Sequence, residues 1–247
     1  MVMYDSKNTS SGFTLVEIAM VIVAVGILIG GVVAAASIKR NAEVLDYIKS
    51  FKHYEASAIK FKELYGELPG DIRNPQSVLT DCSTLPCTRG GNGNGLISDD
   101  LSEYATTDTT QERFVFWNHM YKAGLITGIR GENDVNFDAG QPSAPRGGGF
   151  RIFGHTSATT GAWQKPAEMN HFLGVTAIGG DDYHPWGDNK MPCFLTQRID
   201  AKVDDGIPLW GFVQTGAMCP NGSGDTSTYR TDLAGVTSGT IYWYAKF

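Results

Sequence analysis

The chain has 247 residues and a formal net charge of -6, and 42% of its residues are apolar and 11% aromatic. The acidic balance argues against a protein that coats nucleic acid through its overall charge, so no direct nucleic-acid binding is predicted. The apolar and aromatic content suffices for a packed core, which excludes an intrinsically disordered chain. The length allows one membrane segment and one or two small soluble domains.

The first predicted element is an apolar helix. Residues 18–38 form a run of 21 residues without a charged side chain, and about 20 apolar residues are enough to cross a bilayer core. A secretory signal peptide is the ordinary alternative, because the alanines at 34–36 have the composition of a signal-peptidase site. The run is long for a signal peptide, however, and the residues before it favour a permanent anchor.

Residues 11–17 read Ser-Gly-Phe-Thr-Leu-Val-Glu, directly before the apolar run. This segment resembles the type IV prepilin family, whose signature is Gly-Phe-Thr-Leu-x-Glu ahead of a hydrophobic helix. The resemblance is close over residues 10–40. It implies cleavage after Gly12 by a membrane prepilin peptidase and N-methylation of the new terminus at Phe13. It also implies a leader peptide (1–12), a transmembrane and assembly helix (13–38) and a periplasmic or extracellular pilin-like domain (39–247).

Glu17 is an acidic residue at the mouth of an apolar helix. A carboxylate there costs a few kcal/mol if it enters hydrocarbon without a partner. In the prepilin family the glutamate at this place pairs with the terminal amine of a neighbouring subunit. The resemblance therefore implies an assembly role for Glu17. The alternative is that the side chain lies at the headgroup level and reaches water.

The same resemblance implies a structural subunit of a type IV pilus or a type II secretion pseudopilus. Such a subunit spans the bacterial inner membrane once, with its C-terminal domain in the periplasm, before it enters the filament. Its implied partners are the prepilin peptidase, other pilin or pseudopilin subunits and the inner-membrane assembly platform. The length of the chain after Gly12 favours a minor or specialised subunit. The alternative is a membrane-anchored periplasmic enzyme or ligand-binding domain that uses a pilin-like signal.

The apolar helix is expected to continue as an amphipathic helix over residues 41–65. Apolar residues recur there at steps of roughly three and four, with charged residues between them. The positions expected to form the apolar stripe are Leu45, Ile48, Phe51, Ile59 and either Phe61 or Lys62. This second half is predicted to pack on a sheet and to end at Gly66 and the Pro69-Gly70 pair.

Two loops follow the long helix. Residues 65–71 are similar to the Tyr-Gly-x-Leu-Pro-Gly-Asp turn of many pseudopilin-like proteins, in which Asp71 can cap the turn. Residues 90–100 alternate glycine and asparagine near acidic residues, as calcium loops do. They lack the alternate acidic residues of an EF-hand, so a tight glycine-rich turn is the favoured interpretation. No cofactor is predicted beyond this possible calcium, and no metal ligands are assigned.

The four cysteines are Cys82, Cys87, Cys193 and Cys219, all beyond the apolar helix. An even number of cysteines in an exported domain indicates disulfides, and four cysteines allow three connectivities. We favour Cys82–Cys87, which closes a tight loop, together with Cys193–Cys219. A zinc site is the alternative, although neither spacing matches a standard zinc pattern.

The rest of the chain predicts an α+β fold, with the long N-terminal helix packed on an antiparallel β-sheet as in pilins. A helix is expected over residues 111–122 and a short one over 195–203. Alternation and β-branched or aromatic content predict strands around 149–155, 171–178, 208–214 and 240–246. Two acidic turns, one with Asp181, Asp182 and Asp188 and one with Asp204 and Asp205, have no spacing that specifies a cation site.

No catalytic motif is present, and the five histidines show no metal-binding spacing. The sequence therefore predicts a protein that is not an enzyme. His119 is interpreted as structural. Tryptophans 163, 186, 210 and 243 lie in the C-terminal half, where they either fill a core or contact a surface, a sugar or a secreted cargo. A core role is favoured, because aromatic side chains bury large apolar areas.

Overall fold

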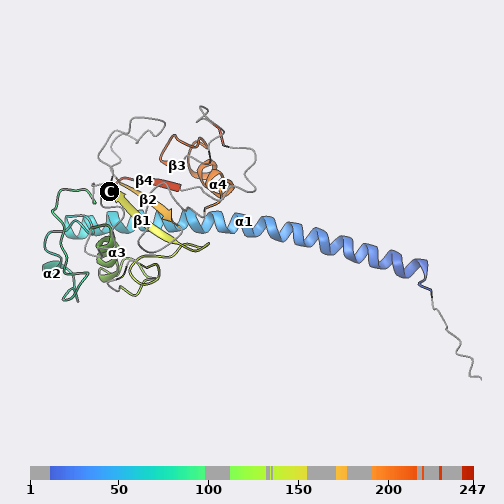
Figure 1. Ribbon diagram of the computed structural model, residues 1–247, viewed down its shortest axis with the longest axis horizontal. Helices are drawn as coiled ribbons and strands as arrows, with labels where there is room; N and C mark the ends of the chain where they lie inside the picture. Colours follow the sequence, from blue (N-terminus) through green and yellow to red (C-terminus); the bar gives the residue numbers. More distant parts are fainter. Residues whose placement is uncertain are drawn as a thin grey trace, which may run out of the picture. The chain divides into compact units, whose positions relative to one another are not determined.

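The structure is a computed structural model that describes residues 12–97, 112–131, 134, 136–154, 171–176, 191–215, 219, 228–229 and 241–247. The chain divides into two compact units, Met1–Glu43 and Val44–Phe247. Figure 1 shows the elements in chain order. They are α1 (Leu15–Tyr65), α2 (Pro75–Val78), α3 (Glu112–Lys122), β1 (Gly149–Gly154), β2 (His171–Thr176), α4 (Cys193–Val203), β3 (Val213–Thr215) and β4 (Ile241–Ala245).

Helix α1 runs without a break for 51 residues, which confirms that the apolar and amphipathic segments form one helix. Within the second unit its buried stripe consists of Val44, Tyr47, Ile48, Phe51, Tyr54, Ser57, Ala58 and Phe61. The predicted stripe was wrong at two positions, because Leu45 is 39% exposed and Ile59 is 36% exposed. Two tyrosines and a serine occupy core-facing positions instead. A prediction from residue polarity alone therefore placed the stripe at the wrong residues.

The four strands form one antiparallel sheet in the order β1-β2-β4-β3. Side chains alternate between its two faces, as the period of two of a strand requires. One face belongs to the main core and carries Phe150, Ile152, Leu173, Val175, Val213, Ile241, Trp243 and Ala245. The other face carries a separate cluster of Phe153, Phe172, Tyr242 and Tyr244. Both faces are therefore buried.

Strands β1, β2 and β4 lie where strands were predicted, and the predicted ends at 155, 177–178 and 240 lie outside the described residues. The strand predicted over 208–214 is wrong in its first half, because only Val213–Thr215 is extended. Pro208 lacks an N–H group for a ladder bond, and Gly211 has a φ of 75°. Both features favour a turn over a strand.

Aromatic rings hold the second half of α1 against the sheet. Phe51 stacks on Trp243 with ring centroids 5.1 Å apart, and it meets Phe150 edge-on at 5.2 Å. The indole N–H of Trp243 donates to Glu55 Oε2 at 3.0 Å. One polar bond thus fixes the ring on which α1 packs, and the pair spans 188 residues of sequence.

Helix α3 is tied to the loops after α1 through His119, which is fully buried. The N–H of Gly70 donates to Nδ1 at 3.0 Å, and Nε2 lies 2.9 Å from the carbonyl oxygen of Cys87. An Nδ1 that accepts requires the proton on Nε2, which then donates to Cys87. Burial lowers the pKa of His119 to about 4, so the ring is neutral at physiological pH. The role is structural.

The close approach of α3 to the turn after α1 makes Gly70 sensitive to an added methyl group. Gly70 and Gly66 both have a positive φ, of 85° and 82°. A Cβ on Gly70 would collide with the carbonyl oxygen of Glu112, whereas a Cβ on Gly66 would meet nothing within 4 Å.

We predict that Gly66→Ala costs about 1–2 kcal/mol, the usual penalty of a left-handed backbone. Gly70→Ala should cost roughly 1–3 kcal/mol more, because α3 has to shift. Urea unfolding of the full-length chain in detergent solution, followed by tryptophan fluorescence, gives both values. Equal losses in the two variants would contradict the close packing of α3.

Candidate functional site

The first turn of α1 contains a hydrogen-bonded pair, Thr14 and Glu17. The N–H and the hydroxyl of Thr14 both donate to Glu17 Oε2 at 2.8 Å. The N–H of Glu17 lies 3.3 Å from Thr14 Oγ1, to which it donates. Because α1 begins at Leu15, Thr14 is the N-cap and Glu17 the third helical residue, which is the geometry of a capping box. The Glu17 carboxylate therefore satisfies donors of its own helix end, beside a favourable helix dipole.

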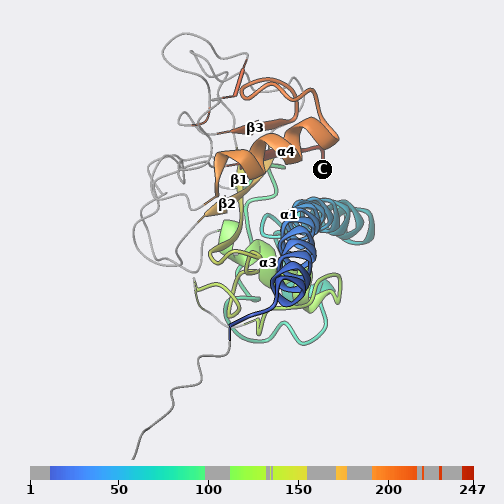
Figure 2. The same ribbon diagram turned by 90° about the vertical axis from the view of Figure 1, so that its right-hand side faces the viewer.

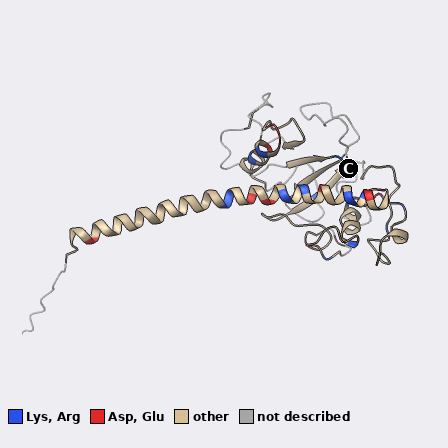
Figure 3. Ribbon diagram, turned by 180° about the vertical axis from the view of Figure 1, so that it is seen from behind, with Lys and Arg blue, Asp and Glu red and all other residues tan. Residues whose placement is uncertain are grey.

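The apolar part of α1 is uncovered along its whole circumference. Every residue from Gly12 to Ala42 is exposed, and Phe13 and Leu15 are 83% and 88% exposed. In the part of the chain that the structure describes, α1 is the helix long and apolar enough to cross a membrane. Figure 3 shows that its lysines, arginines and most of its acidic residues lie in the second half. An exposed apolar helix requires lipid or other helices as its surroundings.

The structure places Gly12 and Phe13 in the exposed segment that leads into α1, two residues or more before its first turn. The backbone there is not part of a helix. Residues 1–11 of the predicted leader lie outside the described residues.

The glycine-asparagine loop closes around Asp71, which is buried. Asp71 Oδ1 accepts from the N–H of Gly93 at 2.6 Å, and Oδ2 accepts from the N–H of Gly95 at 2.7 Å. Both glycines have a positive φ. The loop thus presents N–H groups to a carboxylate, whereas a calcium loop presents oxygens to a cation. The described part of the loop is the tight glycine-rich turn, and Asp99 and Asp100 lie outside the described residues.

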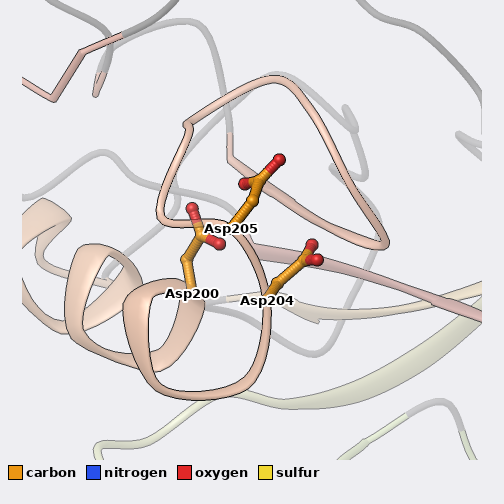
Figure 4. A group of neighbouring side chains, drawn as sticks. All are labelled: Asp200, Asp204 and Asp205. Atoms are coloured by element: carbon orange, nitrogen blue, oxygen red, sulfur yellow. The ribbon is translucent and has the colours of Figure 1, made fainter.

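A second carboxylate cluster lies at the end of α4 (Figure 4). Oxygens of Asp200, Asp204 and Asp205 lie within 4.8 Å of one another. Each carboxylate already accepts a backbone N–H group of the following loop: Gly206 donates to Asp200, Val213 to Asp204 and Ile207 to Asp205. Asp200 also accepts from the hydroxyl of the more distant Tyr229. The cluster therefore fastens the turn that leads into β3.

The three carboxylates differ in their surroundings. Asp200 is fully buried, whereas Asp205 is exposed. Burial raises the pKa of Asp200 to about 7, and the hydrogen bond from Tyr229 only partly opposes this shift. Burial also raises the pKa of Asp204 above its ordinary value. Near neutral pH the cluster accordingly retains a proton on its buried member for part of the time.

The disulfide prediction is confirmed. Cys82 bonds to Cys87 and Cys193 bonds to Cys219, and the described chain contains no free cysteine. The zinc alternative is therefore wrong. The first bond closes the loop whose Cys87 carbonyl accepts from His119. The second joins the start of α4 to a small buried cluster with Tyr229, so it holds the partner of Asp200 in place.

The tryptophans divide between the two predicted roles. Trp243 is 2% exposed and lies in the core, and Trp210 is 46% exposed. The core interpretation is thus correct for Trp243 and wrong for Trp210, which the turn after α4 holds at the surface. Trp163, Trp186 and the acidic turn with Asp181, Asp182 and Asp188 lie outside the described residues.

Two of these contacts were missed by the sequence reasoning, and one of them carried a signal. Thr14-Leu-Val-Glu17 has the Thr-x-x-Glu spacing of a capping box, a pattern that was legible before an apolar run. The pairing of Tyr229 with Asp200 spans 29 residues and has no local signal. It results from the fold of the C-terminal part.

The long apolar N-terminal helix and the four-stranded antiparallel sheet define an α+β protein with a pilin-like layout. Comparison with models of known protein families, with curated proteins and with solved structures finds no match to this chain.

The buried Asp200 makes the stability of the fold depend on pH. The folded chain holds its proton up to a pH of about 7, whereas the ordinary value is 3.8. The stabilising contribution is therefore fully present below about pH 4 and lost as the pH rises through 7. Asp200→Asn keeps a neutral side chain at every pH, and the Tyr229 hydroxyl can rotate to accept from the amide.

We predict that the free energy of unfolding of the wild-type chain falls, relative to that of Asp200→Asn, between pH 4.5 and pH 7.5. Urea titrations at both pH values measure this difference. Asp46→Asn, which changes an exposed carboxylate on α1, serves as the control and should leave the pH dependence unchanged. A constant offset between wild type and Asp200→Asn at both pH values would refute the assignment.

Proposed function

We propose that this chain is a structural subunit of a filament of the type IV pilus or type II secretion pseudopilus class. In this proposal it is made as a precursor, processed after Gly12 and assembled through its N-terminal helix. The single observation that carries the proposal is the segment 12–17 placed at the start of a fully exposed apolar helix. The pilin-like layout of the described residues supports it.

The physical logic of assembly follows from the exposed helix. In a membrane its apolar side chains contact lipid, and in a filament they contact equivalent helices of other subunits. Lipid and packed helices are similarly apolar, so transfer between them costs little hydrophobic free energy. Packing contacts and the pairing of polar groups then decide whether the helix is more stable in the membrane or in the filament. Glycines 26, 30 and 31 leave open space on the helix surface, which permits close contact between helices.

The capping box supplies a reason why Glu17 is tolerated before assembly. Its carboxylate accepts from the N–H and the hydroxyl of Thr14, so the membrane-inserted subunit does not carry an unsatisfied charge at its helix end. We propose that assembly exchanges this internal partner for the terminal amine of a neighbouring subunit at Phe13. An ion pair removed from water is stronger than a hydrogen bond to a hydroxyl.

The proposal places the protein in the bacterial inner membrane as a single-pass protein with a periplasmic C-terminal domain, and later in the filament. Its partners are the prepilin peptidase, other pilin or pseudopilin subunits and the inner-membrane assembly platform. In this proposal the protein is a minor or specialised subunit. In this proposal the chain has no catalytic activity of its own.

The processing step is tested by co-expression with a prepilin peptidase and analysis of the intact mass and the N-terminal peptide. The expected product starts at N-methylated Phe13. Gly12→Val should abolish cleavage, because the bulky side chain lies at the bond to be cut. Gly26→Val is the matched control, since both glycines have open space around them, and it should be processed normally. Cleavage near Ala36, or an unprocessed wild-type chain, would exclude the prepilin assignment.

The assembly step is tested by comparing Glu17→Gln with Thr14→Ala. If Glu17 only caps its own helix, Glu17→Gln should lose little, because glutamine also serves at the third position of a capping box, and Thr14→Ala should lose about 1 kcal/mol. If Glu17 pairs with a neighbouring subunit, Glu17→Gln should reduce the filament-incorporated fraction at least tenfold, for a loss of about 1.4 kcal/mol or more, and Thr14→Ala only slightly. The measurement is the amount of variant recovered in sheared filaments from the native host.

Ser37→Ala is the control for the assembly test. Ser37 is also a small polar residue of the exposed helix, and its hydroxyl donates to the carbonyl oxygen of Ala34 within its own turn. This variant should assemble like the wild type. Equal incorporation of Glu17→Gln and Ser37→Ala would contradict the pairing role.

A further inference from the structure

A cleft of about 440 Å³ opens in the Val44–Phe247 unit, where the last turns of α1 meet the ends of β2 and β4. Figures 1 and 2 show α1 and the sheet, with the C-terminal end of the chain after β4. The residues that shape the cleft are Ile59, Lys62, Glu63, His171, Lys246 and Phe247. Its volume falls within the range of roughly 300–1,000 Å³ that is usual for small-molecule sites.

One wall of the cleft is apolar and fixed. The ring of Phe247 stacks on His171 with centroids 5.0 Å apart. His171 is 2% exposed, and its Nε2 accepts from the N–H of Ile97 at 3.1 Å. The imidazole is thus held from behind, and Phe247 rests on a rigid support. Ile59, which is 36% exposed, lies in the lining as well. An apolar group of a ligand therefore has a preformed surface to contact.

The charges around the cleft are unequal. The carboxylate of Glu63 forms an ion pair with Lys60 at 3.3 Å, so Lys60 compensates the negative charge in the lining. Lys62 also lines the cleft, and its ammonium has no hydrogen-bond or ion-pair partner among the described residues. Lys246 adds a second ammonium to the lining. Lys62 is therefore the cation of the lining that is available to an anion.

We propose that this cleft binds a small organic anion, in which a carboxylate or phosphate is joined to a ring or a branched hydrocarbon. Lys62 binds the anionic group as a point charge with several donors. Ile59 and Phe247 contact the apolar part. The proposal is independent of filament assembly, because every lining residue lies in the second unit and none belongs to residues 12–38.

The test uses the full-length chain in detergent solution, without a tag after Phe247, and ligand-observed NMR titration. The probes are benzoate, phenyl phosphate and the neutral benzyl alcohol. Benzoate, phenyl phosphate or both should bind saturably in the millimolar range or tighter, and benzyl alcohol at least about tenfold more weakly. The stronger of the two anions identifies the preferred anionic group. Higher ionic strength should weaken this binding, because the cleft is open to solvent.

Three single variants locate the binding. Lys62→Gln should weaken binding of the preferred anion about tenfold, the usual effect of losing one charge-assisted contact. Glu63→Gln should strengthen it about two- to threefold, because it removes a like charge. Lys52→Gln is the matched control: Lys52 is exposed on the same helix and does not line the cleft. It changes the net charge as Lys62→Gln does and should leave binding within about twofold of the wild type.

The expected changes in affinity have opposite signs, a loss for Lys62→Gln and a gain for Glu63→Gln. A partly unfolded variant would lose the cleft, so it would not reproduce the gain. Partition of the probes into detergent cancels in the difference between variants. The proposal is overturned if neither aromatic anion binds saturably. It is equally overturned if Lys62→Gln and Lys52→Gln have the same effect, or if benzyl alcohol binds as well as the anions.

Discussion

The stacking of Phe51 on Trp243 is the contact on which the second unit depends. Phe51 lies on α1 and Trp243 on β4, the strand that pairs with both β2 and β3. Because β4 is central, a ring held on it positions the whole sheet against the helix. The bond from Trp243 to Glu55 selects one orientation of the indole. An apolar contact alone would permit rotation or sliding, and the hydrogen bond excludes these alternatives.

The same helix satisfies two very different demands along its length. Beyond residue 43 it buries aromatic and small side chains on one face, so protein supplies its surroundings. Before residue 43 it exposes apolar side chains in every direction, so its surroundings must come from outside the chain. No charged residue lies between Glu17 and Lys39 to oppose insertion into lipid. Lipid and neighbouring helices are the two environments that fulfil this requirement, and the filament subunit proposed above would pass from one to the other.

The sequence predicted those parts of the structure that depend on local composition. The apolar run, the continuation of the helix beyond it and three of the strands follow from the residue types along each segment. The sequence-based prediction failed where a residue's position depends on contacts with residues distant in the sequence. Tyr47 and Tyr54 took core positions in place of Leu45 and Ile59 because the rings of Trp117 and Phe150 meet them there. The placement of Trp210 at the surface depends in the same way on the turn after α4.

Carboxylates that accept backbone N–H groups recur at the ends of the elements. Glu17 accepts from Thr14, Asp71 from Gly93 and Gly95, and Asp204 from Val213. Glycine-rich segments expose many N–H groups, and a buried N–H without an acceptor is costly. An acidic side chain satisfies such groups one or two at a time and requires no metal ion. This explains how a chain with 30 glycines orders its loops, and why its acidic residues resemble cation sites in sequence although they accept hydrogen bonds in the structure.

At the start of α1 the same kind of hydrogen bond has a further consequence. An acceptor that is satisfied by its own helix is retained at low cost until a stronger donor replaces the first, so a capping bond is also a suitable resting state for a residue that pairs later.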